Sequence, residues 1–215
     1  MPRLLQLDSS ADLTTSRSRA ITETFATVWR SLGDGHTVVH RDLHRDPLPH
    51  LTDAALHFPP ALRPEGASPD PEQEELQRVL IAEVLAADVL LIGVPLYNYS
   101  MPSTLKAWVD YIHVPTVTAP IDDPTSQQPL AGRPAVLVSA RGGVYDAGSS
   151  TEFDDHALPA LTLILGNALG MMVETIVATR TLSERFGAPV GEVAAQHREL
   201  AAAHEAAAQA AHRLG

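Results

Sequence analysis

Cysteine is absent from the 215 residues of this chain. This absence excludes disulfide bonds, thiolate nucleophiles and cysteine-ligated metal sites, although it does not by itself assign a cellular compartment. Positive charge is also scarce, because 15 lysine and arginine residues stand against 26 aspartate and glutamate residues, which gives a net charge of -11. A nucleic-acid-binding surface needs clustered cations, so we expect no nucleic-acid partner.

Long apolar runs are also missing. No run is long enough to cross a bilayer, and the N-terminal residues lack the cleavage region of a secretion signal. We therefore expect no membrane partner and a cytoplasmic location. Hydrophobic residues nevertheless make up 45% of the chain, which is enough for the core of one domain. We expect residues 1–215 to form a single domain.

Several catalytic motifs begin in this sequence but are not completed. His36, His40 and His44 are spaced by four, but the valine-rich sequence around them favours a strand, where such residues stand about 13 Å apart. His204 begins an H-E-x-x-H zinc motif that Ala208 leaves without its second histidine. The chain has neither a G-x-S-x-G elbow nor a P-loop lysine. We therefore expect no metal site and no side chain that acts as a nucleophile.

Apolar runs typical of strands alternate along the chain with runs typical of helices. This alternation predicts a parallel sheet with helices on both faces. We expect strands near residues 3–7, 37–42, 88–95, 134–140 and 172–178, and helices near residues 18–32, 71–86, 103–113, 155–168 and 190–213. The proline-rich stretch 58–71 is expected to be an ordered surface loop, with a lid over the ligand as one role for it.

The most informative segment, residues 95–110, directly follows the third expected strand. Loops at the carboxyl ends of parallel strands form the ligand crevice of such sheets, so Tyr97, Asn98 and Tyr99 are placed for binding. Their backbone groups and aromatic surface suit the polar edge and the flat faces of a heteroaromatic ring. Prolines at both ends of the loop restrict its backbone. A structural loop with surface aromatics is the alternative that this segment alone leaves open.

Hydroxyl groups crowd the turn between the first expected strand and the first expected helix. Ser10, Ser16 and Ser18 lie there, with Arg17 between the last two. The free N–H groups and the positive end of the helix dipole bind anions, and serine side chains add donors to a phosphate. The alternative is that Ser16 or Ser18 is only a helix N-cap.

Paired glycines follow the fourth expected strand in the sequence Ala140-Arg141-Gly142-Gly143, with Tyr145 two residues further on. Glycine allows the backbone to approach a ligand closely. Taken alone, this pair is more typical of a turn.

Together the three loops resemble those of FMN-dependent NADH-azoreductases and related NAD(P)H quinone reductases. Those enzymes carry a Y-N-F-type turn before P-x-x-L-K-x-[WY]-x-D, a phosphate loop with Ser-Ser and then Ser-x-Ser, and the sequence S-R-G-G-[IV]-[HY]. Ala140 stands where that last motif usually has its serine. With ligand loops after the first, third and fourth strands, a flavodoxin-like doubly wound sheet of five strands in the order 2-1-3-4-5 fits best. The resemblance implies that FMN is bound by Ser10, Ser16, Arg17, Ser18, Pro95, Leu96, Tyr97, Asn98, Tyr99, Ala140, Arg141, Gly142, Gly143 and Tyr145.

The resemblance also implies an activity. NADH or NADPH would pass a hydride to FMN and leave, and a quinone, an azo compound or a nitroaromatic compound would then be reduced in the same pocket. No side chain is expected to be catalytic, because the cofactor carries the chemistry. Family members are homodimers with the flavin at the subunit interface. Alignment from Tyr97 puts Ala119 where azoreductases often have an aromatic residue that reaches the partner's flavin, so we expect Ala119, Tyr99 and Tyr145 to line the substrate pocket.

Three other interpretations remain open at this point. A quinone reductase with little azo activity has the same sequence features. A flavodoxin-like electron carrier would bind FMN without turning over NAD(P)H, although such carriers tend to be shorter and strongly acidic around the flavin, whereas arginines flank two of the three loops here. A scaffold that has lost the flavin is the third.

Overall fold

The structure is a computed structural model that describes residues 1–120 and 128–215. Its five strands are all parallel and form one sheet in the order β2-β1-β3-β4-β5. This order confirms the predicted flavodoxin-like topology. The strands are β1 (Arg3–Asp8), β2 (Thr37–Asp42), β3 (Val89–Pro95), β4 (Pro134–Ala140) and β5 (Met172–Ala178), close to the predicted ranges.

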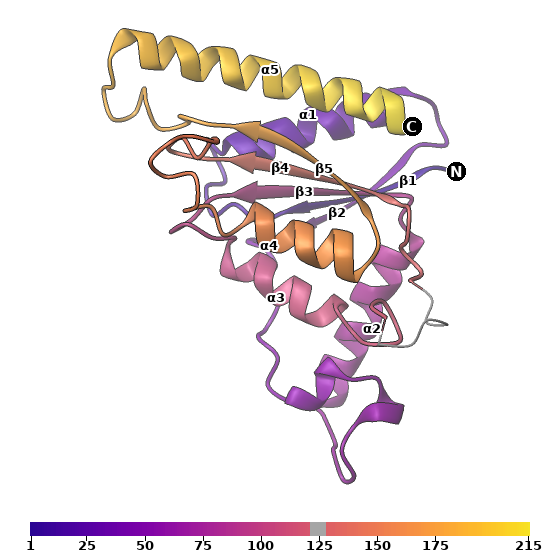
Figure 1. Cartoon of the computed structure of the whole chain (residues 1–215). Coiled ribbons are helices and arrows are strands. Elements are labelled where there is room, and N and C mark those ends of the chain that lie inside the picture. Colours follow the sequence, from indigo (N-terminus) through magenta and orange to yellow (C-terminus); the bar gives the residue numbers. More distant parts are fainter. Residues whose placement is uncertain (121–127) are drawn as a thin grey trace.

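Helices cover both faces of the sheet (Figure 1). One face carries α1 (Arg17–Ser31) and α5 (Val190–Leu214), and the other carries α2 (Pro71–Ala86), α3 (Ser103–Ile112) and α4 (Leu158–Thr162). Two short 3-10 helices that the sequence did not predict, η1 (Ala54–His57) and η2 (Pro60–Leu62), precede α2. In the part of the chain that the structure describes, no helix has the length and apolar character needed to cross a membrane.

The fourth helix begins at Leu158, later than the predicted start near residue 155. The carboxylate of Asp155 accepts hydrogen bonds from the backbone N–H groups of Ala157 (2.8 Å) and Leu158 (3.2 Å). This residue therefore satisfies donors at the helix start as a capping side chain does, instead of lying inside the helix. The rest of the predicted range continues as a π-helical segment, η3 (Leu163–Ala168).

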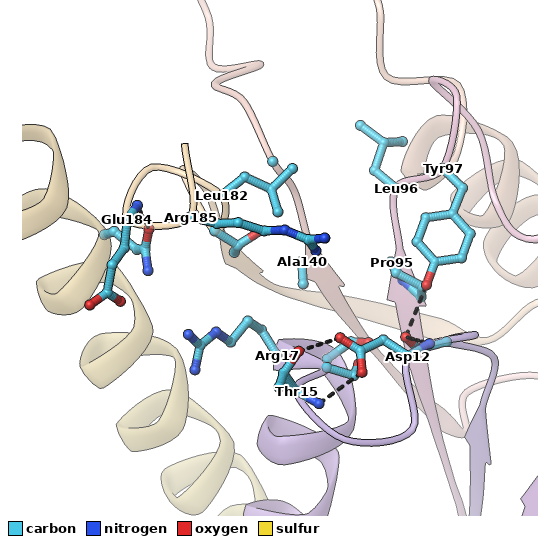
Figure 2. A pocket seen from close by; sticks show the side chains of 16 residues that line it. Asp12, Thr15, Arg17, Pro95, Leu96, Tyr97, Ala140, Leu182, Glu184 and Arg185 are labelled. Atoms are coloured by element: carbon cyan, nitrogen blue, oxygen red, sulfur yellow. Dashed lines mark hydrogen bonds between the residues drawn. The ribbon is translucent and has the colours of Figure 1, made fainter. Parts of the chain in front are cut away.

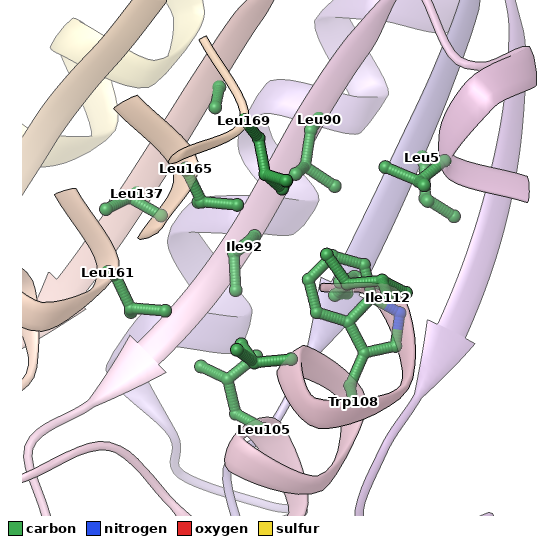
Figure 3. Close-up of a cluster of buried hydrophobic side chains, with 14 of the residues drawn as sticks. Leu5, Leu90, Ile92, Leu105, Trp108, Ile112, Leu137, Leu161, Leu165 and Leu169 are labelled. Carbon is green, nitrogen blue, oxygen red and sulfur yellow. The ribbon is translucent and has the colours of Figure 1, made fainter. Parts of the chain in front are cut away.

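The sheet divides the hydrophobic core into two clusters. Figure 3 shows the cluster on the α3 and α4 side, whose labelled members are Leu5, Leu90, Ile92, Leu105, Trp108, Ile112, Leu137, Leu161, Leu165 and Leu169. Leu4, Leu91 and Val136 alternate with these strand residues and belong to the cluster under α1 and α5. Because both faces of the sheet are buried, the edge at the carboxyl ends of the strands is the place left for a polar ligand.

The proline-rich stretch 58–71 packs on α2. Arg63 forms an ion pair with Glu74 of that helix and donates hydrogen bonds to the carbonyls of Ala55 and Phe58. None of its residues lines the hollows at the carboxyl edge that are described below. The stretch is therefore a surface loop, as expected, and its contacts with α2 place it away from these hollows, so the lid role stays a prediction.

Candidate functional site

Two neighbouring hollows lie at the carboxyl edge of the sheet, where the loops after β1, β3, β4 and β5 meet. The first has a volume of about 450 Å³ and lies between the start of α1 and the segment before α5 (Figure 2). The second has a volume of about 480 Å³ and lies between the β3–α3 and β4–α4 loops. Leu96, Gly142 and Leu182 line both hollows, so the two form one continuous candidate site.

The hydroxyl-rich turn forms the floor of the first hollow, which Ser10, Ser16, Arg17 and Ser18 all line as predicted. Ser16 is also the N-cap of α1, since its Oγ accepts a hydrogen bond from the backbone N–H of Arg19 (3.3 Å). Ser16 is therefore an N-cap that also lines the hollow, so the capping role does not exclude the predicted phosphate contact. An exposed helix N-terminus beside three hydroxyl groups is a site suited to an anion.

Asp12 brings a negative charge to this same hollow. Its carboxylate accepts hydrogen bonds from the Thr15 side chain and from the backbone N–H groups of Thr15 and Thr14 (2.8 and 2.9 Å). These bonds hold the pKa of Asp12 well below its usual range. An anion bound here must therefore be held against a permanent carboxylate charge.

Tyr97, in the loop after β3, forms hydrogen bonds with the loop after β1. Its hydroxyl oxygen lies 3.0 Å from the Oγ of Ser10 and accepts a hydrogen bond from the backbone N–H of Ala11 (3.1 Å). Backbone hydrogen bonds in both directions close a tight turn between Tyr97 and Ser100 (2.9 and 3.0 Å). Asn98 and Tyr99, the two central residues, have φ of 48° and 68°. Left-handed backbone is unusual for tyrosine and concentrates at functional sites, which supports a binding role for this turn.

The glycine pair faces the second hollow together with Asn98, Tyr99 and Tyr145. Gly142 packs so closely against the segment after β5 that a Cβ there would lie 2.7 Å from Cδ1 of Leu182. Burial raises the pKa of Tyr145 above an ordinary value that already lies well above neutral pH, so its hydroxyl can donate a hydrogen bond. Ala140, at the end of β4, lines the first hollow.

Arg141 is the one predicted cofactor residue that does not line either hollow. Its Nη2 lies 2.6 Å from Oδ2 of Asp155, and both side chains are buried. Its guanidinium also lies 5.8 Å from the ring centroid of Tyr145. The structure thus places this side chain inside the protein, where an ion pair holds the glycine loop to the cap of α4.

Ala119 is not brought together with Tyr99 and Tyr145. It is only 3% exposed and belongs to the hydrophobic cluster on the α3 side. Its carbonyl accepts a hydrogen bond from the backbone N–H of Thr116 (2.7 Å). Its predicted position beside a partner subunit's flavin stays a prediction.

The segment between β5 and α5 closes the site from a side that the sequence motifs did not indicate. It contributes Thr181, Leu182, Glu184 and Arg185 to the first hollow, which Gln196 of α5 also lines. The second hollow receives Leu182, Ser183, Phe186 and Ala188 from it. The signal was present in the sequence, because a segment after the fifth strand must leave the same edge of a parallel sheet as the loops after β1, β3 and β4.

An ion pair beneath the floor of the first hollow holds the loop after β1 in place. Arg19 donates to both carboxylate oxygens of Asp42 (2.7 Å each) and to the carbonyl of Ser10 (2.7 and 3.1 Å). Although burial opposes it, hydrogen bonding by Arg19 and by the backbone N–H groups of Arg45 and His44 lowers the pKa of Asp42 to about 2. Arg19 therefore links the end of β2 to the loop that carries Ser10.

The buried carboxylate of Asp8 anchors the same edge. It accepts hydrogen bonds from the side chains of Gln6 (3.0 Å) and Thr22 (2.8 Å), and it lies 2.9 Å from Nε2 of His40. The hydrogen bond with Asp8 raises the pKa of His40. All of these groups lie below the loops, so they support the site without lining it.

A parallel sheet of this order, with its ligand hollows at the carboxyl edge, defines a flavodoxin-like α/β protein. A model of the flavodoxin-like fold family matches residues 2–212. A protein of Kineococcus radiotolerans named FMN-dependent NADH:quinone oxidoreductase is 56% identical over 214 residues, which cover 100% of this chain and 98% of that protein. A protein of Streptomyces avermitilis with the same name is 36% identical and covers 100% and 97%. The chain therefore belongs to the flavodoxin-like fold family, in the branch of the FMN-dependent NADH:quinone oxidoreductases.

Solved structures show the same fold. An azoreductase from Bacillus anthracis superposes with a TM-score of 0.78 at 21% identity, over 99% of this chain and 100% of that one. An FMN-dependent NADH-azoreductase from the same species, solved in complex with FMN, gives a TM-score of 0.78 at 20% identity, over 97% and 99%. The relatives at 56% and 36% identity confirm the family predicted from the three loops, and these structures confirm the fold.

Proposed function

We propose that this protein is an FMN-dependent NAD(P)H oxidoreductase that reduces quinones, and azo compounds as further acceptors. One observation carries the proposal: the continuous hollow has serine hydroxyls and a helix N-terminus at one end, and tyrosines with paired glycines at the other. A phosphorylated flavin has matching chemistry, with a dianion at one end and a flat ring at the other. The names of the relatives at 56% and 36% identity support the same function.

The residues present fit FMN in charge and in shape. Ser10, Ser16 and Ser18 would donate hydrogen bonds to the phosphate, and Arg17 would add a charge-assisted bond. At Gly142 a side chain would have to displace the side chain of Leu182, whereas glycine leaves the backbone to line the hollow. When bound, FMN supplies the redox chemistry, by accepting a hydride from NAD(P)H and passing the reducing equivalents to the acceptor.

At the other end, the protein orients a flat ring and its acceptor. The left-handed turn at Asn98 and Tyr99 presents backbone polar groups beside the glycine pair, where the pyrimidine edge of a flavin would find partners. The Tyr145 hydroxyl, which is protonated at neutral pH, would donate a hydrogen bond, and Tyr99, which is 55% exposed, offers an aromatic face to a quinone. In this proposal the protein contributes position and polarity, and no side chain forms a covalent bond with substrate.

The absorption spectrum of the purified protein tests this function. We expect flavin bands that bleach on anaerobic addition of NADH or NADPH and return when menadione is added. A protein that binds FMN but is not bleached by either donor is an electron carrier instead. A protein that remains colourless with added FMN is a scaffold without flavin.

We further propose that the protein works as a homodimer in the cytoplasm, where NADH would be supplied. The dimer rests on the resemblance to azoreductases and on exposed apolar side chains on the α4 side, where Leu163 is 60% exposed. The proposed partners are small molecules only, with no nucleic acid and no membrane.

A further inference from the structure

We propose that Arg185, in the segment between β5 and α5, binds the phosphate of FMN from the wall opposite Ser16, Arg17 and Ser18. This inference rests on the proposed function. It assigns a phosphate contact to a segment that none of the three sequence motifs includes, and it makes the phosphate site two-sided.

Two arginines from different segments line the first hollow. Arg17 stands on the floor at the start of α1, while Arg185 comes from the segment after β5, and both line the same 450 Å³ space. Figure 2 shows the Arg185 guanidinium reaching over the hollow toward Ala140, whereas the Glu184 side chain points away. Oε2 of Glu184 lies 3.6 Å from Nε2 of His197 of α5, which does not line the hollow.

Three other arginines lie at this edge of the sheet, Arg19 in α1, Arg141 after β4 and Arg180 after β5, and each forms an ion pair. Arg17 and Arg185 form no ion pair with any residue within the described ranges. In a chain with a net charge of -11, two uncommitted guanidinium groups on one hollow are available for an anion.

The phosphate group of FMN requires positive charge in the hollow that binds it. A phosphate monoester carries close to two negative charges at neutral pH. The carboxylate of Asp12, whose pKa is lowered by its threonine partners, repels that phosphate in the same hollow. Among the charged side chains that line this hollow, Asp12 and Glu184 are negative and Arg17 and Arg185 are positive, so without Arg185 the phosphate would meet a lining of net negative charge. Arg185 supplies a cation, in a fork whose geometry matches phosphate oxygens.

Hydrogen bonds and an ion pair fix the segment that carries Arg185. The N–H of Glu184 donates to Oε1 of the buried Gln196 (3.0 Å), and the N–H of Thr181 donates to the carbonyl of Arg141 (3.0 Å). Arg180, with a left-handed φ of 56°, pairs with Glu199 of α5. The segment is therefore fixed both to the glycine loop and to α5, and the entropy lost when Arg185 closes on a phosphate is mainly that of its own side chain.

The test compares FMN with riboflavin, which lacks the phosphate, on flavin-free full-length protein, by quenching of flavin fluorescence. Arg185→Gln should weaken FMN binding about tenfold or more, as expected for loss of a charged hydrogen bond, and should change riboflavin binding less than twofold. Its log Kd for FMN should also depend less steeply on salt concentration. Unchanged riboflavin binding shows at the same time that the variant is folded.

Arg198→Gln is the matched control. Arg198 is an exposed arginine of α5 that does not line the hollow, so its loss changes net charge by the same amount. Equal FMN affinities for the two variants, or equal losses of FMN and riboflavin in Arg185→Gln, would overturn the phosphate contact while leaving the proposed function intact. If the wild-type protein binds neither flavin, the proposed function fails, and this inference fails with it.

Discussion

At the residue scale, the serines of the first hollow have two roles that can be separated by experiment. Ser16 caps α1 and lines the hollow, whereas Ser18, which is fully buried, lines the hollow from inside the first turn of the helix. Loss of a cap lowers stability by about 1 kcal/mol, whereas loss of a phosphate donor lowers affinity for the phosphorylated ligand alone. The ligand comparison therefore reports on binding, and the unfolding curve reports on the cap.

We predict that Ser16→Ala combined with Ser18→Ala weakens FMN binding at least tenfold and leaves riboflavin binding nearly unchanged, as measured by fluorescence quenching. Thr27→Ala, on the exposed face of the same helix and outside the hollow, is the control and should alter neither. Equal losses for both flavins would show that these serines do not hold the phosphate.

Arg141 is a predicted cofactor residue whose side chain forms an internal ion pair and lines neither hollow. Its charge is buried against Asp155, and removing one member of a buried pair leaves the other without compensation. We predict that Arg141→Met lowers the free energy of unfolding by about 3 to 5 kcal/mol in urea titrations. The double variant with Asp155→Asn should regain much of this loss, because asparagine still caps α4 and carries no charge.

A loss below about 1 kcal/mol in Arg141→Met would contradict a structural role for the pair. FMN binding by folded Arg141→Met should also be weakened less than in the serine variant, since the side chain does not line the hollow. A selective loss of FMN over riboflavin in Arg141→Met would return Arg141 to the cofactor site.

At the scale of elements, the Arg19–Asp42 pair joins α1, the end of β2 and the carbonyl of Ser10. The pKa of Asp42 is lowered from 3.8 to about 2 in the folded protein. A carboxyl with a lowered folded pKa adds stability that is fully present above its unfolded pKa and disappears as pH falls through the folded value. The contacts of the ionised Asp42 carboxylate with Arg19 and with the backbone N–H groups of Arg45 and His44 together therefore stabilise the protein at neutral pH by about 2 kcal/mol.

We predict that Asp42→Asn unfolds about 2 kcal/mol more easily than the wild type at pH 7, and that the difference shrinks between pH 4 and pH 2. Denaturant titrations at several pH values measure it. Asp46→Asn is the control, because the Asp46 side chain is 87% exposed and has only a 3.9 Å contact with Arg41. It should change the free energy of unfolding very little. A difference that stays constant down to pH 2 would show that proton uptake by Asp42 is not the cause.

The helices and strands show which features of the fold can be predicted from the sequence. The strand positions can be predicted because buried parallel strands are continuous apolar runs in the sequence. The strand order follows from the positions of the three ligand loops. The start of α4 does not follow, because Asp155 can either begin a helix or cap one, and only its bonds to Ala157 and Leu158 decide. The inward turn of Arg141 cannot be predicted either, since its partner Asp155 lies further along the same β4–α4 connection and no local pattern marks the pairing.

At the scale of the whole molecule, the candidate site is assembled from four loops, of which three carried recognisable motifs. The fourth, after β5, has no motif because its contribution depends on sheet order: β5 lies beside β4, so its loop packs on Gly142 and on α5. We retain the proposal that residues 1–215 form one domain, since both hydrophobic clusters share the one sheet.

The second proposal at this scale is the homodimer. Light scattering at low micromolar concentration should give about twice the chain mass of 23.0 kDa. Leu163, which begins η3 and is 60% exposed, is a candidate interface residue, and a charge buried there without a partner would oppose association. We predict that Leu163→Arg shifts the protein toward the monomer and weakens FMN binding in parallel, because the flavin site would be shared. Val190→Arg, at the 86% exposed start of α5, should leave the mass unchanged. A wild-type monomer with full FMN occupancy and full turnover would rule out a shared site.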